Sequence, residues 1–178
     1  MIITSIAIVI IIIFITGLYV AAEFAIVSSR RTKVYQLASQ GDPLAKMLMP
    51  VLEDPRRLNR YVTACQIGIT VGSLVLGAYA RTTLVDGLAV TLERLFAGSL
   101  TSTAAQNLGQ IAAIVLVVTF IVALQVILGE LFPKSLALQY PETIARGAWW
   151  PMRISQWLFA IPIWLITASA NVLLRLLG

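Results

Sequence analysis

Long apolar runs alternate with short basic stretches along this chain. Residues 2–27, 62–80 and 111–131 form three runs that contain few charged side chains. A helix needs about 20 residues to cross a hydrocarbon core of ~30 Å. The pattern therefore predicts an all-α membrane protein with three transmembrane helices over these ranges.

The stretch 28–61 has a different composition, with seven Lys or Arg side chains and two turn signals, Gly41-Asp42-Pro43 and Asp54-Pro55. Its apolar positions recur at helical spacing, which predicts a cytoplasmic juxtamembrane helical hairpin. We expect Arg30, Arg31 and Lys33 to face lipid phosphates.

We expect a multi-pass protein of the plasma (inner) membrane, and because basic side chains follow the first run and none precedes it, the positive-inside rule predicts its orientation. Its N-terminus is expected outside and its C-terminus in the cytoplasm. Residues 81–110 are then an extracellular connection.

The C-terminal stretch 141–178 combines tryptophans with helix-breaking prolines. Tryptophan is enriched at the level of the lipid headgroups, and Pro151 and Pro162 divide the stretch into pieces shorter than a comfortable span. We expect an interfacial belt on the cytoplasmic side rather than a fourth crossing.

Composition narrows the function. Of the 178 residues, 59% are hydrophobic and 12% are charged, whereas soluble domains are about 25% charged. The single Cys65 excludes an internal disulfide, and the absence of histidine removes the commonest soft-metal ligand. The net charge of +5 lies mainly between the apolar runs, where it sets topology, so nucleic acid is not an expected partner. No His cluster or Ser/Lys pair at a shared depth indicates an enzyme.

The third run ends in a carboxylate, Glu130, three residues before Pro133. A carboxylate in hydrocarbon costs at least ~2.5 kcal/mol and needs a partner, a water-filled cavity or a cation. Pro133 is expected to kink the helix and free the Gly129 carbonyl, which would place two hard oxygen ligands side by side. Two interpretations stay open: a Mg²⁺ or Ca²⁺ site, or a helix end at which Glu130 pairs with Lys134. Glu23, near the end of the first run, is interpreted as a snorkelling or Arg-paired carboxylate.

The second run is rich in small and polar residues. Glycines such as Gly72 and Gly77 are interpreted as a face for close helix packing, either within the chain or in a dimer. We expect a homodimer built on the small-residue faces of the second and third runs. Gln66, Thr70 and Ser73 recur on one helical face. They form either the polar lining of a cavity or hydrogen bonds between helices.

Three motifs resemble a known family: Ala-Ala-Glu-Phe-Ala-Ile-Val-Ser-Ser-Arg-Arg at 21–31, Cys-Gln-Ile-Gly-Ile-Thr at 65–70 and Leu-Gly-Glu-Leu-Phe-Pro-Lys at 128–134. Together they resemble the transmembrane domain of the CorC/CNNM magnesium transporters. The resemblance implies a homodimer in the lipid bilayer that exports Mg²⁺, coupled to Na⁺ entry. It also implies a metal site made of Ser28, Ser73, the Gly129 carbonyl and Glu130.

Family members usually continue into a cytoplasmic CBS-domain pair and a CorC domain, and this chain contains neither. The alternative to transport is a membrane scaffold, in which small-residue helices dimerise and the basic hairpin binds lipid or a partner. Loss of Mg²⁺ binding in Glu130→Gln would separate the two functions.

Overall fold

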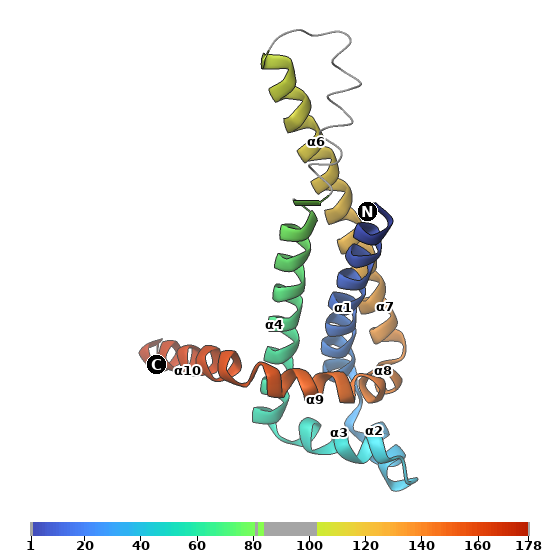
Figure 1. The fold of residues 1–178 in the computed structure, drawn as a ribbon. Helices are drawn as coiled ribbons and strands as arrows, with labels where there is room; N and C mark the ends of the chain where they lie inside the picture. The colour runs from blue at the N-terminus through green and yellow to red at the C-terminus, as the bar shows by residue number, and fades with distance from the viewer. Residues whose placement is uncertain (1, 81, 84–102, 178) are drawn as a thin grey trace.

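A computed structural model describes residues 2–80, 82–83 and 103–177, and over these ranges the chain is built from helices without strands (Figure 1). The prediction of an all-α fold is confirmed. The elements are α1 (Ile2–Ser28), α2 (Arg31–Ser39), α3 (Pro43–Glu53), α4 (Pro55–Ala80), α6 (Thr103–Leu124), a π-helix (Gln125–Leu131), α7 (Phe132–Gln139), α8 (Pro141–Gly147), α9 (Trp149–Leu158) and α10 (Ala160–Leu177).

Three stretches of helix in this part of the chain are long and apolar enough to cross a membrane: Thr4–Ser28, Pro55–Ala80 and Ile114–Gln139. The second begins at Pro55 rather than at residue 62, because Asp54 accepts a hydrogen bond from the backbone N–H of Arg56 and starts the helix early. The third continues past Leu131 through the π-helix into α7. Much of the expected extracellular connection, at 81 and 84–102, lies outside the described residues.

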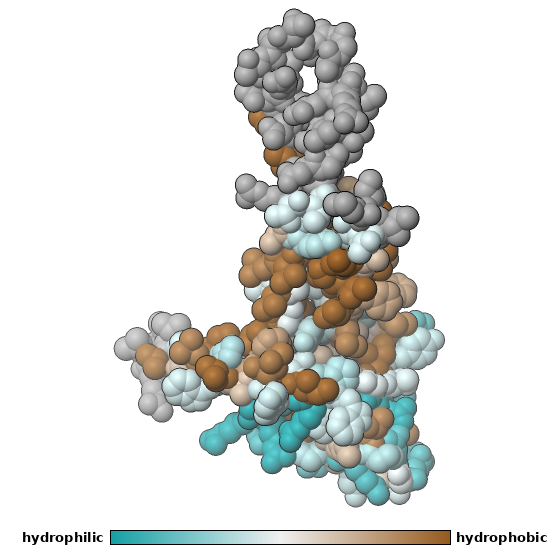
Figure 2. All heavy atoms as spheres, viewed as in Figure 1, coloured by the Kyte–Doolittle hydropathy of each residue, from teal (hydrophilic) through white to brown (hydrophobic). Residues whose placement is uncertain are grey.

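Apolar side chains cover the outer faces of these helices (Figure 2). Below this apolar zone, polar and basic side chains gather around α2, α3 and the start of α4. We call this end of the molecule, at which α1 ends at Ser28 and α4 begins at Pro55, the hairpin end.

Glycines bring α1 and α4 together within the chain. A Cβ added at Gly68 would lie 2.5 Å from the Tyr19 ring, and one at Gly72 would overlap the Thr16 hydroxyl. Gly72 therefore serves a packing contact between α1 and α4 within the chain. A Cβ at Gly77 would meet nothing within 4 Å among the described residues.

The third span consists of α6, the π-helix and α7 and is called the third helix below. It packs against the other face of α1, again through glycine. A Cβ at Gly17 would lie 2.9 Å from Pro133 Cγ and 3.3 Å from the Leu128 carbonyl oxygen. The absence of a side chain at Gly17 lets the backbone of α1 approach the segment that carries Gly129 and Glu130.

The hairpin of α2 and α3 is capped and then fastened to α8. Gly41 has φ 98°, and the Asp42 carboxylate accepts hydrogen bonds from the backbone N–H groups of Leu44 and Ala45 at the start of α3. The same carboxylate pairs with Arg146. Hydrogen bonds from Ala45 first, and then from Arg146 and Leu44, hold the pKa of Asp42 below its usual value.

A second ion pair joins α2 to α8: Lys33 Nζ lies 3.3 Å from the Glu142 carboxylate, which is buried. Burial raises the pKa of Glu142, but a backbone hydrogen bond and Lys33 outweigh this effect, so the pKa lies below its usual value. Lys33 thus has an ion-pair partner within the chain, but its side chain stays exposed, as do those of Arg30 and Arg31. The expectation that these three side chains face lipid phosphates stays a prediction.

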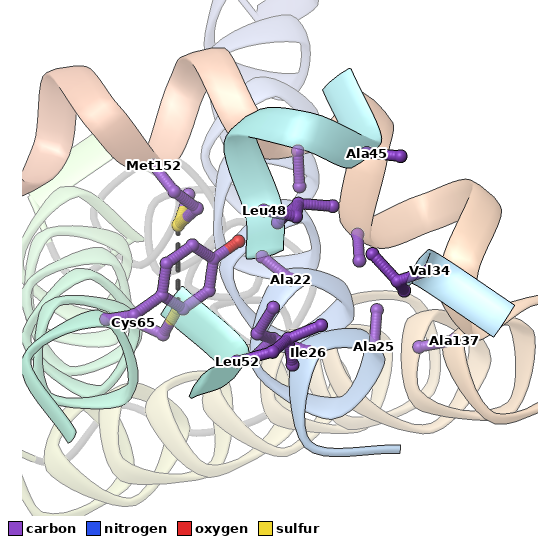
Figure 3. Packing of buried hydrophobic residues seen from close by; sticks show 13 residues of the cluster. Ala22, Ala25, Ile26, Val34, Ala45, Leu48, Leu52, Cys65, Ala137 and Met152 are labelled. Atoms are coloured by element: carbon purple, nitrogen blue, oxygen red, sulfur yellow. Dashed lines mark hydrogen bonds between the residues drawn. The ribbon is translucent and has the colours of Figure 1, made fainter. Parts of the chain in front are cut away.

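The C-terminal helices α9 and α10 run across the bundle at its hairpin end (Figure 1). Tyr19 and Ser155 share a hydrogen bond of 2.8 Å between α1 and α9, and Cys65 Sγ lies 3.5 Å from Met152 Sδ (Figure 3). Cys65 and Met152 belong to a buried apolar cluster that joins α1 to α2, α3, α4, α7, α8 and α9. The crosswise arrangement, with Trp157 80% exposed, suits the expected interfacial belt.

Candidate functional site

A polar contact between α4 and the π-helix forms the centre of the candidate site. The Gln125 side-chain amide donates a hydrogen bond of 2.6 Å to the Ser73 hydroxyl. Both residues lie within candidate spans, far in sequence from the nearest charged residues of the hairpin. The contact therefore places two oxygen-bearing side chains together inside the apolar zone.

Gly129 and Glu130 lie next to this contact. Gly129 is buried, and a Cβ there would lie 3.6 Å from Gln125 Cγ and 3.6 Å from the Ile13 carbonyl oxygen. Glu130 follows directly and is exposed in the single chain. Ser73, Gln125 and Gly129 are thus contiguous, and Glu130 is the next residue along the π-helix.

Lys134 does not neutralise Glu130. Within the described part of the chain, no carboxylate oxygen lies within 4.0 Å of the Lys134 ammonium. That ammonium sits instead 4.5 Å from the centre of the Phe24 ring on α1. The interpretation that Glu130 forms an ion pair with Lys134, four residues further along the helix, is therefore wrong.

The backbone around Glu130 departs from α-helical geometry. Gln125–Leu131 is a π-helix, and the N–H of Phe132 donates to the carbonyl of Ile127, five residues back. Pro133 follows at the start of α7. Proline cannot donate to an i−4 carbonyl, so a wider turn just before it accommodates the missing hydrogen bond. Single π-helical turns inside longer helices are frequently found at functional sites.

Ser28 is not brought together with the other predicted ligands. On α1, Thr16 faces Gly72, the neighbour of Ser73, and Ile13 faces Gly129. Ser28 lies twelve residues beyond Thr16, about 18 Å further along a helix that rises 1.5 Å per residue. It belongs to the hairpin end, so the four predicted ligands do not form one site in this structure.

Gln66 and Thr70 are both exposed and lie between Ser73 and the hairpin end. The Thr70 hydroxyl donates to the Gln66 backbone carbonyl at 2.9 Å, while the Gln66 side chain lies near the Glu23 carboxylate. Glu23 has no Arg or Lys partner within 4.0 Å among the described residues. The Glu23–Gln66 pair is therefore a second polar contact between α1 and α4, separate from Ser73.

Two polar residues of this region, Gln125 and Thr16, were absent from the sequence prediction. Gln125 interrupts an apolar run four residues before Gly129, and this polar interruption was a sequence signal that pointed to it as a site residue. Thr16 is fully buried at the level of Ser73, and its hydroxyl donates to the Ile12 carbonyl at 2.9 Å. A hydroxyl in the first span at this level is therefore supplied by Thr16 and not by Ser28.

Hydroxyl, amide, carboxylate and backbone carbonyl oxygens are hard ligands of the kind that Mg²⁺ accepts. The described residues contain no group of three or more His, Cys, Asp and Glu side chains able to hold a metal together. A cation at Ser73, Gln125, Gly129 and Glu130 would therefore meet mainly neutral oxygens and one carboxylate.

Residues 6–178 match the family described as the Cyclin M transmembrane N-terminal domain, CNNM. The chain belongs to the CNNM family. The resemblance drawn from its three motifs is thereby confirmed, and the family is one of membrane transporters rather than of a known class of enzyme.

Curated relatives of this CNNM chain include the UPF0053 protein YrkA of Bacillus subtilis, 37% identical over 93% of the chain and 36% of the relative. The UPF0053 protein sll0260 of Synechocystis is 33% identical over 94% of the chain and 35% of the relative. The polyamine export protein of Haemophilus influenzae is 28% identical over 88% of the chain and 34% of the relative. The chain thus spans about a third of the length of these relatives.

Proposed function

We propose that this chain is the membrane part of a Mg²⁺ transporter that exports the ion from the cytoplasm, coupled to Na⁺ entry. The observation that carries the proposal is the contiguous set of Ser73, Gln125 and Gly129 beside Glu130, on a π-helical segment within the apolar zone. In the proposal, the cation binds to oxygens of Ser73, Gln125, Gly129 and Glu130. The site opens to one side of the membrane at a time.

The chemistry of the donors supports a small divalent cation. Mg²⁺ binds oxygen in near-octahedral geometry and dehydrates reluctantly, so it usually keeps several waters beside one or two carboxylates. Glu130 supplies the carboxylate, and its exposure leaves room for such waters. Ca²⁺ prefers more ligands at longer distances, which this small donor set offers less well.

The wider assembly is part of the same proposal. The chain functions as a homodimer in the plasma membrane, with its hairpin in the cytoplasm and its C-terminus leading toward the CBS-pair and CorC domains usual in the family. The concentration of basic side chains at the hairpin end supports this orientation.

Two other functions compete with Mg²⁺ export. A scaffold would use the same helices without moving an ion. A polyamine substrate is suggested by the name of the Haemophilus influenzae relative, and the two carboxylates in the spans, Glu23 and Glu130, are where ammonium groups would bind.

Flux through purified chain in proteoliposomes distinguishes these three functions. We expect Mg²⁺ movement, followed with an indicator dye, that Glu130→Gln abolishes and Glu53→Gln, on the exposed surface of α3, leaves intact. Movement of labelled spermidine without Mg²⁺ movement would replace the proposal with polyamine export. Movement of neither would favour the scaffold.

A further inference from the structure

An apolar groove runs along the outside of the molecule between α1 and the third helix. It has a volume of about 900 Å³, and its lining residues are aliphatic, aromatic, glycine or proline side chains of α1, α6, the π-helix and α7. Several of them, including Phe14, Phe120 and Phe132, are more than 60% exposed. The groove therefore opens toward the surroundings of the bundle, at the depth of the candidate spans.

The dimensions of the groove indicate what fits it. On α1 it extends from Ile6 to Ala21, a length of about 22 Å at 1.5 Å per residue. A flexible hydrocarbon chain can lie along a groove of this length, in contact with apolar side chains on both sides.

A cation lies at the hairpin end of the groove. Pro133 and Leu136 line the groove, and Lys134 stands between them in the chain with its ammonium over Phe24, one turn beyond Ala21. Lys134 is exposed and, among the described residues, has no carboxylate within 4.0 Å. An ammonium of this kind is a good point-charge partner for phosphate.

We propose that this groove is a binding site for an anionic phospholipid from the leaflet on the hairpin side. One acyl chain lies between α1 and the third helix, and the phosphate faces Lys134. The apolar lining alone would accept a tail of any lipid, so the preference for an anionic headgroup comes from Lys134. The site is independent of the cation site at Glu130.

The first test is competition between lipids with identical acyl chains. The chain is purified with equal amounts of phosphatidylglycerol and phosphatidylcholine, and the retained lipid is measured by native mass spectrometry. One Lys near a membrane surface contributes about 1 kcal/mol toward anionic lipid, so we expect about a fivefold preference for phosphatidylglycerol. Lys134→Gln should lose it, and Lys46→Gln, on the exposed surface of α3, should keep it. Equal retention of both lipids by the unmodified chain would overturn the proposal.

The second test locates the tail without a substitution. A phosphatidylglycerol with a photoreactive group on its acyl chain should cross-link to peptides of α1 and of the third helix in preference to the exposed face of α4. Even labelling of all exposed faces would mean ordinary surrounding lipid and would overturn the proposal, as would burial of the groove by a second copy.

A matched pair of substitutions then tests the groove itself. Ala21→Leu, which narrows the groove, should reduce lipid retention several-fold, while Ala78→Leu on the exposed face of α4 should not. Both proteins are first checked for native helix content and elution volume. Unchanged retention in a folded Ala21→Leu protein would contradict the placement of the tail.

Discussion

Replacing Gly68 by Ala should destabilise the chain by forcing α1 and α4 apart. The added Cβ would lie 2.5 Å from ring atoms of Tyr19, well inside van der Waals contact. The ring cannot move freely, because its hydroxyl shares a 2.8 Å hydrogen bond with Ser155 on α9. Overpacking of this kind costs about 1–3 kcal/mol, and breaking the hydrogen bond adds about 1 kcal/mol.

Gly77→Ala is the matched control, because its Cβ would meet nothing within 4 Å among the described residues. It reports the gain of up to about 1 kcal/mol that Ala brings by restricting the unfolded chain. The free energy of unfolding, measured by denaturant titration in mixed micelles, should therefore be lower in Gly68→Ala than in Gly77→Ala by about 2–4 kcal/mol.

A double-mutant cycle assigns this loss to one contact. In a Tyr19→Ala background the clash is absent, so Gly68→Ala should cost less than about 0.5 kcal/mol. Equal effects of Gly68→Ala in both backgrounds, or equal stabilities of Gly68→Ala and Gly77→Ala, would refute the close approach of α1 and α4.

Two further predictions concern the placement of the ligands and the docking of the hairpin. Ser73→Ala should weaken Mg²⁺ binding measured by calorimetry, whereas Ser28→Ala, about 18 Å from Thr16 along α1, should leave it unchanged. The reverse pattern would restore Ser28 to the site. Because the pKa of Asp42 is lower in the folded chain than its usual value, its contribution to hairpin docking is complete above pH ~4 and is lost as the pH falls through the folded-state pKa. Hydrogen exchange of the α2 and α3 amides should therefore become steeply faster below that pH. In Asp42→Asn this exchange should already be fast at pH 7 and should depend much less on acid. Identical exchange profiles of the two proteins would show that the Asp42–Arg146 pair does not hold the hairpin.

The three spans could be predicted from the sequence because apolar runs long enough to cross a bilayer, with few charges in them, are typical of transmembrane helices. Their boundaries could not. Asp54 and Pro55 start α4 early through a local cap, and the π-helix carries the third span through Pro133, which alone suggests a helix end. Both effects depend on hydrogen bonds that hydropathy does not register.

The candidate site was predicted in part. Gly129 and Glu130 stood out because a carboxylate and a proline are costly in an apolar run. Gln125 and Thr16 become part of the site only because Gln125 contacts Ser73 and Thr16 contacts Gly72, both on α4. These contacts depend on how the helices are aligned, which the sequence does not show. Ser28 was assigned by resemblance, and the rise of α1 places it at a different depth. The predicted homodimer stays a prediction, but the space beside Gly72 is already filled by the Thr16 side chain of the same chain.

The most direct test of the proposed cation site is the effect of Mg²⁺ on the unfolding free energy of purified chain with and without Glu130. An ion that binds only the folded state adds RT ln(1 + [L]/Kd), about 2.7 kcal/mol at a hundredfold excess over Kd. We expect this stabilisation in the unmodified chain and in the surface control Glu53→Gln, and its loss in Glu130→Gln. The same Mg²⁺-dependent stabilisation in Glu130→Gln would contradict a cation site built on this carboxylate.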